Sequence, residues 1–225
     1  MPATLESTLV SAPLPSVRRL PRYLVFLKEC RNLGRVVVSC THIAEYLALD
    51  PTLVRKDLAL TGIVGKPRIG YPVDELIASI ETFLGWNNTS DAFLVGVGHL
   101  GKALLGFREF EARGLRIVAA FDADPARVGT SVHGREVLPM EKLANLVERM
   151  HIHIGIITVP RDAAQQVADA LVKAGIRAIW NFTITSLHVP EGIVVENADL
   201  TPSLAALSSR LKAALETAEE RRMLV

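Results

Sequence analysis

Three glycines near the middle of the chain have the spacing of a dinucleotide-binding turn. Gly96, Gly98 and Gly101 follow a short apolar run in the stretch DAFLVGVGHLGKALL. In a G-x-G-x-x-G fingerprint the first glycine permits a tight turn from strand to helix, the second lets the backbone approach a pyrophosphate, and the third lets the helix pack on the sheet. The amides and the dipole at the start of that helix favour phosphate oxygens. The predicted chemistry is therefore the binding of a dinucleotide through its pyrophosphate.

An acid at the right distance supports this prediction. A second apolar run, LRIVAAF, ends at Asp122, which lies 21 residues after Gly101. An acid in this position accepts hydrogen bonds from the hydroxyls of an adenosine ribose. We therefore expect NAD(H) rather than coenzyme A or another nucleotide, because Asp122 suits a free ribose diol. The alternative is a glycine turn in some other doubly wound protein, since the fingerprint by itself is not specific.

The elements around these residues predict a parallel sheet and a last helix. The run HIHIGIITV, the helical stretch PRDAAQQVADALVKAG and the run RAIW alternate as strand, helix and strand, which is typical of a parallel sheet. A short strand, GIVV, comes next, and a helix is predicted over residues 201–222. Its leucines recur on one face: Leu204, Leu207, Leu211 and Leu215. This stripe either packs on its own domain or docks on a partner subunit, because an apolar face needs a surface that covers it.

The N-terminal part of the chain is basic. Between Ser16 and Tyr71 there are ten Lys or Arg residues against four acids, a net charge of +6 in a chain whose total is +1. The remaining residues therefore carry about −5. Such an asymmetry indicates that the N-terminal part meets phosphate groups.

The same part has helix-turn-helix order. From Ser16 the stretch VRRLPRYLVFLKECRNLG predicts a first helix, with Leu20, Leu24 and Leu27 on one face. Ser39 or Thr41 can cap a second helix, and Asp50 followed by proline opens a third that runs to about Thr61. In the third helix Val54, Leu58 and Thr61 are expected in the core, and the opposite face carries Thr52, Arg55 and Lys56. A small, polar and basic face fits a DNA major groove, although most faces of this kind are only solvated.

A β-hairpin wing is predicted directly after the third helix. The stretch GIVGKPRIGYPV combines glycine and proline turn signals with side chains that suit nucleic acid: Lys66, Arg68 and Tyr71. A basic wing beside a recognition helix supplies a second contact with phosphates or with the minor groove.

The composition and length of the chain argue against several other classes of protein. The chain has 225 residues, which suits two domains, and it contains neither a long uncharged apolar run nor a basic start followed by an apolar block. Membrane insertion and secretion are therefore not predicted. Cys30 and Cys40 lack C-x-x-C spacing, so we expect reduced thiols in the cytoplasm rather than a disulfide or a zinc site. The histidines show no spacing that favours catalysis, and neither a catalytic residue nor a metal ligand is predicted.

Taken together, these features resemble the Rex family of redox-sensing transcriptional repressors. The resemblance covers residues 16–211, in the stretches RLPRYL, VRKDL, GVGHLGKAL, FDADP, TVPRDAAQQVADALVKAGIRAIWNF and ADLTPSLAALS. It implies a homodimer that binds palindromic operator DNA when NAD⁺ predominates and releases the DNA when NADH binds. Two departures are ALTG after VRKDL, where the family has an aromatic pair, and KPR, where its wing has a basic residue followed by glycine.

The resemblance also implies roles for individual residues. Arg55 and Lys56 would contact DNA, and the cofactor-binding residues would be Gly96, Gly98, His99, Leu100, Gly101, Asp122, Thr158, Pro160 and Asn181. Arg19 matches a basic residue of the family's first helix, and Asp199 matches an acid that meets the partner subunit. Phe107 stands where the family has a tyrosine, and it lacks the hydroxyl that contacts this acid in the NADH-bound form. The helix with Leu204, Leu207 and Leu211 would be exchanged between subunits.

We therefore predict an α/β protein with an N-terminal winged-helix domain, a Rossmann-type dinucleotide-binding domain and a C-terminal helix. The expected boundaries are a flexible start over 1–15, a winged helix over 16–84, a linker over 85–90, the NAD(H)-binding domain over 91–200 and a dimerisation helix over 201–225. The predicted function is that of a cytoplasmic homodimeric repressor without enzymatic turnover. The alternatives are an NAD(H)-binding paralogue that does not bind operator DNA and a small NAD-dependent oxidoreductase, which would need a substrate domain and an acid or base near the nicotinamide.

Overall fold

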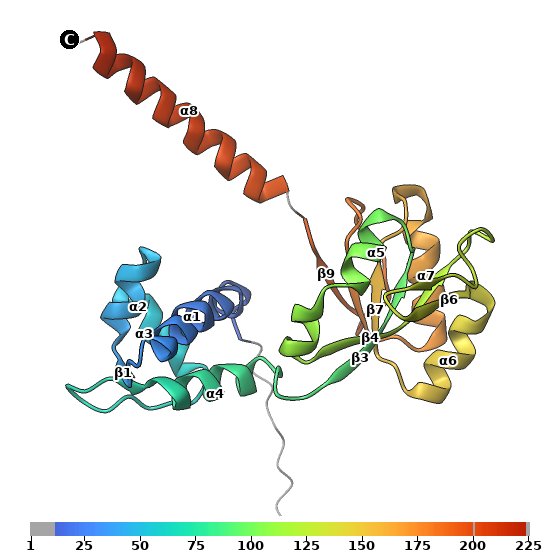
Figure 1. The fold of residues 1–225 in the computed structure, drawn as a ribbon, viewed down its shortest axis with the longest axis horizontal. Coiled ribbons are helices and arrows are strands. Elements are labelled where there is room, and N and C mark those ends of the chain that lie inside the picture. Colours follow the sequence, from blue (N-terminus) through green and yellow to red (C-terminus); the bar gives the residue numbers. More distant parts are fainter. Residues whose placement is uncertain (1–11, 200, 224–225) are drawn as a thin grey trace, which may run out of the picture. The chain divides into compact units, whose positions relative to one another are not determined.

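The structure is a computed structural model that describes residues 12–199 and 201–223. The chain divides into two compact units, Met1–Asn88 and Thr89–Val225, and Figure 1 shows the elements of each. The boundary between the units falls inside the segment for which a linker is predicted. Most of the flexible start expected over residues 1–15 lies outside the described residues.

The N-terminal unit is a helical domain with a small sheet. Its elements are α1 (Leu14–Asn32), β1 (Val37–Val38), α2 (Cys40–Leu47), α3 (Pro51–Ala59), β2 (Tyr71–Pro72) and α4 (Val73–Phe83). Strands β1 and β2 pair antiparallel, with Val38 opposite Tyr71. Between α3 and β2 the chain forms a hairpin closed by a bridge between Lys66 and Gly70. The predicted winged-helix order is confirmed.

Local signals explain where these helices begin. Ser39, rather than Thr41, caps α2, because its side chain accepts from the backbone N–H of His42. Asp50 caps α3 by accepting from the N–H groups of Thr52 and Leu53. Helix α1 begins at Leu14, two residues before the predicted start, and contains Pro21.

The core of the N-terminal unit covers the inner face of α3. Val54 and Leu58 are fully buried there, together with Leu20, Leu24 and Leu27 of α1. The leucine face predicted for α1 and the core positions Val54 and Leu58 of α3 are therefore confirmed. Thr61 lies beyond the helix end at Ala59 and is half-buried.

The C-terminal unit contains a seven-stranded sheet with the order β5-β6-β4-β3-β7-β8-β9. Its elements are β3 (Ser90–Val95), α5 (His99–Leu105), η1 (Arg108–Arg113), β4 (Leu115–Asp122), β5 (Ser131–Val132), β6 (Arg135–Pro139), η2 (Met140–Lys142), α6 (Leu143–Met150), β7 (Ile154–Ile157), η3 (Arg161–Ala163), α7 (Ala164–Ala174), β8 (Ala178–Asn181), β9 (Val194–Asn197) and α8 (Thr201–Met223). The pairings are parallel except for that of β5 with β6. The predicted Rossmann-type arrangement is confirmed, and β5, β6 and α6 are additions to it.

Alternation along β3 explains why this sheet is buried on both faces. Phe93 and Val95 belong to one buried cluster, whereas Ala92 and Leu94 belong to another. Successive side chains of a strand point to opposite faces, so helices must cover both sides of the sheet.

The strand order reverses between β3 and β7. From β3 the chain continues to β4 and β6 on one side, and β7, β8 and β9 follow on the other. In open α/β sheets a ligand binds beyond the carboxyl ends of the strands at such a switch point. The segments that follow β3 and β7 are the glycine turn and the stretch from Thr158 to Pro160.

Candidate functional site

The glycine turn after β3 packs closely against neighbouring backbone. Gly96 has φ +101°, and a Cβ atom there would lie 2.8 Å from the carbonyl carbon of Thr158. A Cβ atom on Gly101 would collide with the carbonyl oxygen of Gly96. Gly98 differs, because no atom lies within 4 Å of a Cβ built there. Gly96 and Gly101 thus allow the turn to pack, and Gly98 leaves open space in front of it.

Thr158, which follows β7, forms hydrogen bonds with this turn. Its Oγ1 lies 2.6 Å from the carbonyl oxygen of Gly96 and 3.1 Å from that of Val95, and its backbone N–H donates to the Val95 carbonyl at 2.9 Å. Thr158 therefore holds the two strand ends together at the switch point.

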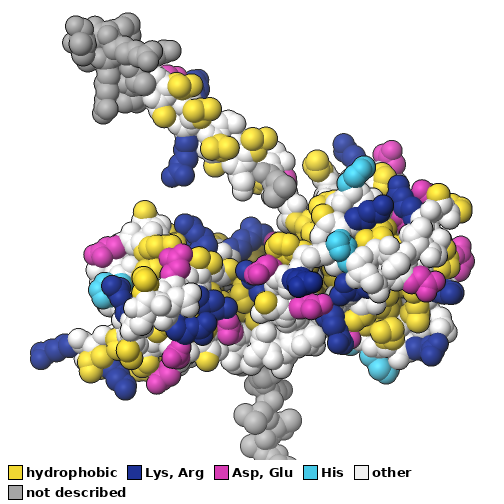
Figure 2. All heavy atoms as spheres, in the orientation of Figure 1, with side chains coloured by type: hydrophobic (Ala, Val, Ile, Leu, Met, Phe, Trp, Pro, Cys, Tyr) yellow, Lys and Arg dark blue, Asp and Glu magenta, His cyan; other side chains and the backbone are white. Residues whose placement is uncertain are grey.

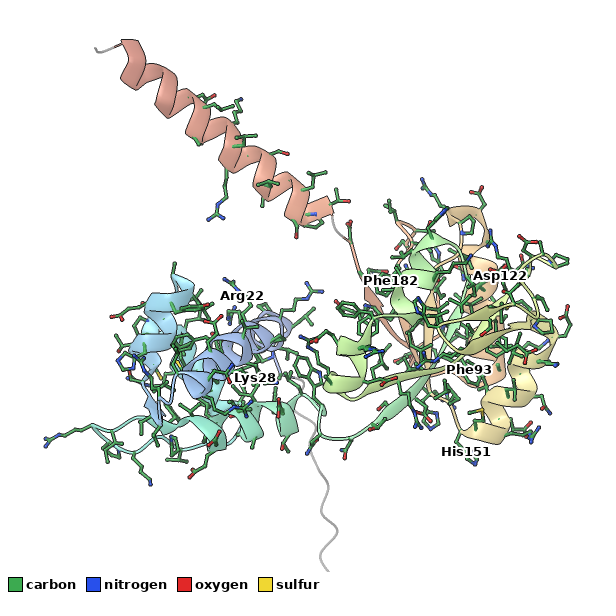
Figure 3. All side chains as sticks on the ribbon, viewed as in Figure 1. Arg22, Lys28, Phe93, Asp122, His151 and Phe182 are labelled. Carbon is green, nitrogen blue, oxygen red and sulfur yellow. The ribbon has the colours of Figure 1, made fainter. Side chains whose placement is uncertain are left out.

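Asp122 ends β4 and is 6% exposed. Its carboxylate accepts from the backbone N–H of Val97 at 2.7 Å, from the N–H of Asp124 at 2.9 Å and from Arg127 at 3.0 Å. Burial by itself would raise the pKa of Asp122, but these hydrogen bonds outweigh burial and lower the pKa. The carboxylate is therefore an anion, and its bond with Val97 ties the glycine turn to β4. Figure 3 labels Asp122 in the C-terminal unit.

Arg127 is the charged neighbour that the sequence prediction missed. It forms ion pairs with Asp122 at 3.0 Å and with Asp124 at 3.3 Å. The stretch FDADPAR is the sequence signal for this contact. In the turn after Asp122, Asp124 accepts from the backbone N–H of Ala126, and the turn brings Arg127 back to Asp122.

A cavity of about 670 Å³ opens beside these groups. Its lining includes Gly96, Gly98, Asp122, Thr158 and Pro160 among the predicted residues, and Arg127, Met140, Ala163 and Val167 as additions. Cofactor pockets have volumes on the order of 300–1,000 Å³, with mostly apolar walls and a few polar groups. The open space at Gly98, the acid at the strand end and the apolar wall fit a dinucleotide.

The other predicted cofactor residues lie elsewhere. His99 and Leu100 open α5 with exposed side chains, and they do not line this cavity. Asn181 is fully buried. Its amide donates to the carbonyl of Thr185 and to the side chain of Asn197, and accepts from Thr183. These hydrogen bonds hold the loop after β8, and a cofactor contact of Asn181 stays a prediction.

The candidate DNA-binding surface lies on α3 and the wing. Thr52, Arg55 and Lys56 are exposed on α3, and Lys66 and Arg68 are exposed on the wing. Figure 2 shows several Lys and Arg side chains over this unit. A hollow of about 350 Å³ brings Arg55 together with wing residues that include Lys66 and Arg68. The structure thus places Arg55 of the helix and the two basic residues of the wing around one hollow, whereas Lys56 does not line it.

Tyr71 lies at the base of the wing. It is half-buried against the core, and its hydroxyl lies 4.0 Å from Sγ of Cys40. Burial, followed by the neighbouring Cys40, raises its pKa. The ring lies against Gly65 of the wing and also lines the hollow beside Arg55.

Arg19 has a partner inside its own unit. Its guanidinium forms two hydrogen bonds, of 2.6 and 2.8 Å, with the carboxylate of Asp57 in α3. Sequence reasoning treated Asp57 only as one acid in a basic block, yet it is 1% exposed.

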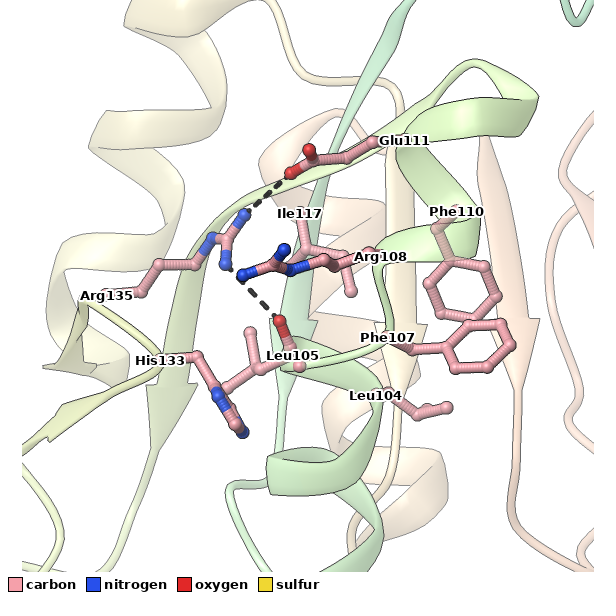
Figure 4. A pocket seen from close by; sticks show the side chains of 10 residues that line it. Leu104, Leu105, Phe107, Arg108, Phe110, Glu111, Ile117, His133 and Arg135 are labelled. Atoms are coloured by element: carbon pink, nitrogen blue, oxygen red, sulfur yellow. Dashed lines mark hydrogen bonds and ion pairs between the residues drawn. The ribbon is translucent and has the colours of Figure 1, made fainter.

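Phe107 stands at the start of a row of aromatic rings. It is 49% exposed, and its ring centroid lies 4.9 Å from that of Phe110, which lies 5.2 Å from Trp180. Phe107 also lines a cavity of about 550 Å³ with Arg108, His133 and Arg135. Figure 4 shows Arg135 between Glu111 and the carbonyl of Leu105 in this cavity.

The last helix leaves its leucine stripe uncovered in the single chain. Leu204, Leu207 and Leu211 are 62%, 65% and 57% exposed, and Figure 2 shows hydrophobic side chains along the helix. Asp199, which is exposed, accepts from the backbone N–H of Thr201 at the start of α8.

Within the described residues, no helix is long and apolar enough to span a bilayer. The same residues contain no group of three or more His, Cys, Asp or Glu side chains that could hold a metal ion.

Comparisons with known proteins cover both units. A model of the CoA binding domain family matches residues 87–185, and a model described as a putative DNA-binding protein N-terminus matches residues 11–59. The redox-sensing transcriptional repressor Rex of Treponema denticola is 49% identical over 193 residues, which cover 86% of this chain and 92% of the relative. The Rex protein of Bacteroides fragilis is 43% identical over 199 residues, which cover 88% of this chain and 90% of the relative.

Solved structures agree with these relatives. RSP, described as a Rex-family repressor, has a TM-score of 0.84 and 33% identity, and the match covers 93% of this chain and 98% of RSP. It has also been solved with β-NADH, and with β-NAD⁺ and operator DNA, with the same TM-score of 0.84 in each case. The chain belongs to the Rex family of redox-sensing transcriptional repressors.

Proposed function

We propose that this chain is a transcriptional repressor that binds operator DNA with NAD⁺ or with no cofactor bound, and releases the DNA when NADH binds. The observation that carries this proposal is that RSP, which has the same fold, has been solved both with β-NADH and with β-NAD⁺ and operator DNA. This chain has candidate groups for the dinucleotide in one unit and for DNA in the other.

In the proposed cofactor site, the turn of Gly96, Gly98 and Gly101 receives the pyrophosphate. The open space at Gly98 supports this assignment. His99 and Leu100 contribute backbone amides at the start of α5. A carboxylate can accept about four hydrogen bonds. The carboxylate of Asp122 can therefore accept from the adenosine ribose in addition to its partners within the protein. Thr158 and Pro160 form the wall opposite the turn.

In the proposed DNA site, α3 enters the major groove and the wing contacts the backbone beside it. Arg55 and Lys56 would reach base edges or phosphates, and Thr52 would allow close approach. Lys66 and Arg68 would add phosphate or minor-groove contacts. The exposure of all five side chains supports this assignment.

The functional form is a homodimer in the cytoplasm. The leucine stripe of α8 supports a dimer, because four exposed leucines at helical spacing need a covering surface: Leu204, Leu207, Leu211 and Leu215. A two-fold symmetric dimer matches a palindromic operator, since each half-site receives one recognition helix.

Release by NADH requires differential affinity. NADH must bind the released arrangement of the dimer more tightly than the DNA-competent one, and by linkage operator DNA must weaken NADH binding by the same factor. A coupling of about 3 kcal/mol changes either affinity by roughly 150-fold. The chain then works as a binding protein that reads the ratio of NADH to NAD⁺, without enzymatic turnover.

Selection of DNA tests this function directly. The full-length protein, with NAD⁺ present, is mixed with a pool of duplexes that carry a randomised central segment, and bound duplexes are amplified over successive rounds. We expect enrichment of a palindrome, and loss of the enriched duplex when NADH replaces NAD⁺. Failure to enrich any sequence, or enrichment unaffected by NADH, would contradict the proposal.

A further inference from the structure

A buried acid lies on the inner face of the proposed recognition helix. Asp57 follows Arg55 and Lys56 in α3, but it is 1% exposed whereas they are exposed. Aspartate is almost never fully buried unless it is paired, because an unpaired charge loses its hydration. Its burial therefore depends on specific partners.

Three side chains of α1 surround this carboxylate, and together with Asp57 they form what we call the Asp57 cluster: Ser16, Arg19, Tyr23 and Asp57. Nε of Arg19 donates to Oδ2 of Asp57 at 2.6 Å, and Nη2 donates to Oδ1 at 2.8 Å. The hydroxyl of Tyr23, which is fully buried, donates to Oδ2 at 2.6 Å. Nη2 of Arg19 also donates to the hydroxyl of Ser16 at 3.2 Å.

The charges in the cluster are complementary. Burial by itself would raise the pKa of Asp57, but the hydrogen bonds from Arg19, Tyr23 and Ser16 lower it, so the carboxylate stays ionised at neutral pH. Burial first, and then Asp57, raises the pKa of Tyr23, so its hydroxyl remains a donor. The cluster is therefore a satisfied network over the whole neutral range.

Such a network constrains α3 in a way that its apolar contacts do not. Val54 and Leu58 bury α3 against the core, but apolar burial is non-directional and tolerates rotation or sliding of the helix. A bidentate arginine-carboxylate pair fixes both distance and angle. A buried ion pair adds little net stability compared with a well-packed apolar replacement, so its main effect is expected on the geometry of α3.

We infer that Arg19 and Tyr23 are positioning residues for operator recognition, which hold α3 at the rotation and depth at which Arg55 and Lys56 meet base edges. This inference rests on the proposed function, because it concerns the same DNA-binding surface. It gives Arg19 of α1 a role inside its own unit, through Asp57.

A comparison of the affinities for specific and non-specific DNA distinguishes a positioning role from a merely structural one. Phosphate contacts dominate non-specific binding and tolerate a shifted helix, whereas base contacts require alignment. Misalignment of α3 therefore lowers the affinity for a selected operator duplex more than the affinity for a scrambled duplex of the same length and composition.

The experiment compares small changes with matched controls in the full-length protein. Tyr23→Phe removes one hydroxyl, and Arg19→Lys removes the bidentate geometry but keeps the charge. Tyr46→Phe is the control for the first change, because the Tyr46 hydroxyl donates at 2.8 Å to Glu29 and not to Asp57. Arg116→Lys is the control for the second, because Arg116 makes a bidentate pair with Asp91, at 2.8 and 2.9 Å, in the other unit.

Fluorescence anisotropy gives the affinity of each variant for the selected and the scrambled duplex, well below its melting temperature. We expect Tyr23→Phe and Arg19→Lys to lower the ratio of the two affinities by roughly tenfold, the loss of about one aligned base contact. Both controls should keep the wild-type ratio, and NADH affinity should be unchanged in all four variants.

The outcomes separate this inference from the proposed function. If the wild-type protein prefers the selected duplex and both Asp57-cluster variants keep its ratio, the inference is wrong and the proposed function stands. Equal losses for both duplexes, in step with a lower melting temperature, would assign the cluster to stability alone and would also overturn the inference. A wild-type protein without preference for any duplex would contradict the proposed function, and the inference with it.

Discussion

Arg127 donates to the carboxylate of Asp122 at 3.0 Å, at the edge of the cavity beside the glycine turn. The acid expected to select NAD(H) is therefore paired with a cation that lines the same cavity. An acid at this position repels a 2′-phosphate, whereas an arginine nearby accommodates one. We therefore predict that the balance between these two side chains sets the preference between NADH and NADPH.

Replacement of the acid tests this balance. Asp122→Ala should weaken NADH binding by roughly tenfold, because the ribose loses an acceptor and the N–H of Val97 loses its partner. It should also narrow the preference for NADH over NADPH, because Arg127 is then free to meet a 2′-phosphate. Titrations of both reduced cofactors, followed by their fluorescence, measure the two affinities.

Asp124→Ala is the matched control, since Asp124 also pairs with Arg127, at 3.3 Å, but does not line the cavity. It should leave the preference close to that of the wild type. Equal binding of NADH and NADPH by the unchanged protein would refute the assignment of Asp122.

The basic face of α3 gives the second prediction. Arg55→Ala and Lys56→Ala should each weaken operator binding by about 1–3 kcal/mol if a base contact is lost, and a lost phosphate contact should also reduce the salt dependence. Anisotropy at several salt concentrations distinguishes the two. NADH affinity should be unchanged, because the cavity belongs to the other unit. An operator affinity unaffected by both changes would show that this face is only solvated.

Thr158 provides a test of how the glycine turn is held. Thr158→Val keeps the side-chain shape but removes the hydroxyl that lies 2.6 Å from the Gly96 carbonyl. We expect several-fold weaker NADH binding, consistent with about 1 kcal/mol for one hydrogen bond. Thr158→Ser, which keeps the hydroxyl, should bind NADH nearly as the wild type does. Isothermal titration calorimetry measures both variants, and the assignment fails if the valine variant binds like the wild type.

The leucine stripe of α8 predicts how the dimer forms. Glutamate at both Leu207 and Leu211 should weaken the dimer at least about a hundredfold, because each buried leucine contributes about 1.5–3 kcal/mol. Sedimentation velocity over a range of concentrations measures this. The control, Ala206→Glu with Ser209→Glu, adds the same charge on the opposite face of α8. A double variant at the leucines that remains fully dimeric would show that this stripe is not the interface.

The sequence predicts the fold well where local signals and periodicity agree. The glycine turn, the strand that ends at Asp122 and the Asp50 cap of α3 are found from residue types and spacing alone. Helix α6 and the β5–β6 hairpin are not predicted from the sequence. The strands β5 and β6 are short, with two and five residues, and α6 has only eight.

The site is less predictable than the fold, because partners far apart in sequence decide it. Asp57 and Arg19 are 38 residues apart, and nothing local distinguishes Asp57 from a solvated acid beside two basic residues. Asn181 follows the same rule, since its partner Asn197 lies on another strand. Such pairs appear only once helices and strands are packed.

The most direct test of the central claim is a titration of NADH into the complex of this protein with its selected operator duplex, followed by anisotropy of labelled DNA at fixed salt. We predict that saturating NADH releases the duplex and that NAD⁺ at the same concentrations leaves the complex intact. We also predict that operator DNA weakens NADH binding by the same factor by which NADH weakens operator binding. A complex that remains bound at saturating NADH would contradict the account.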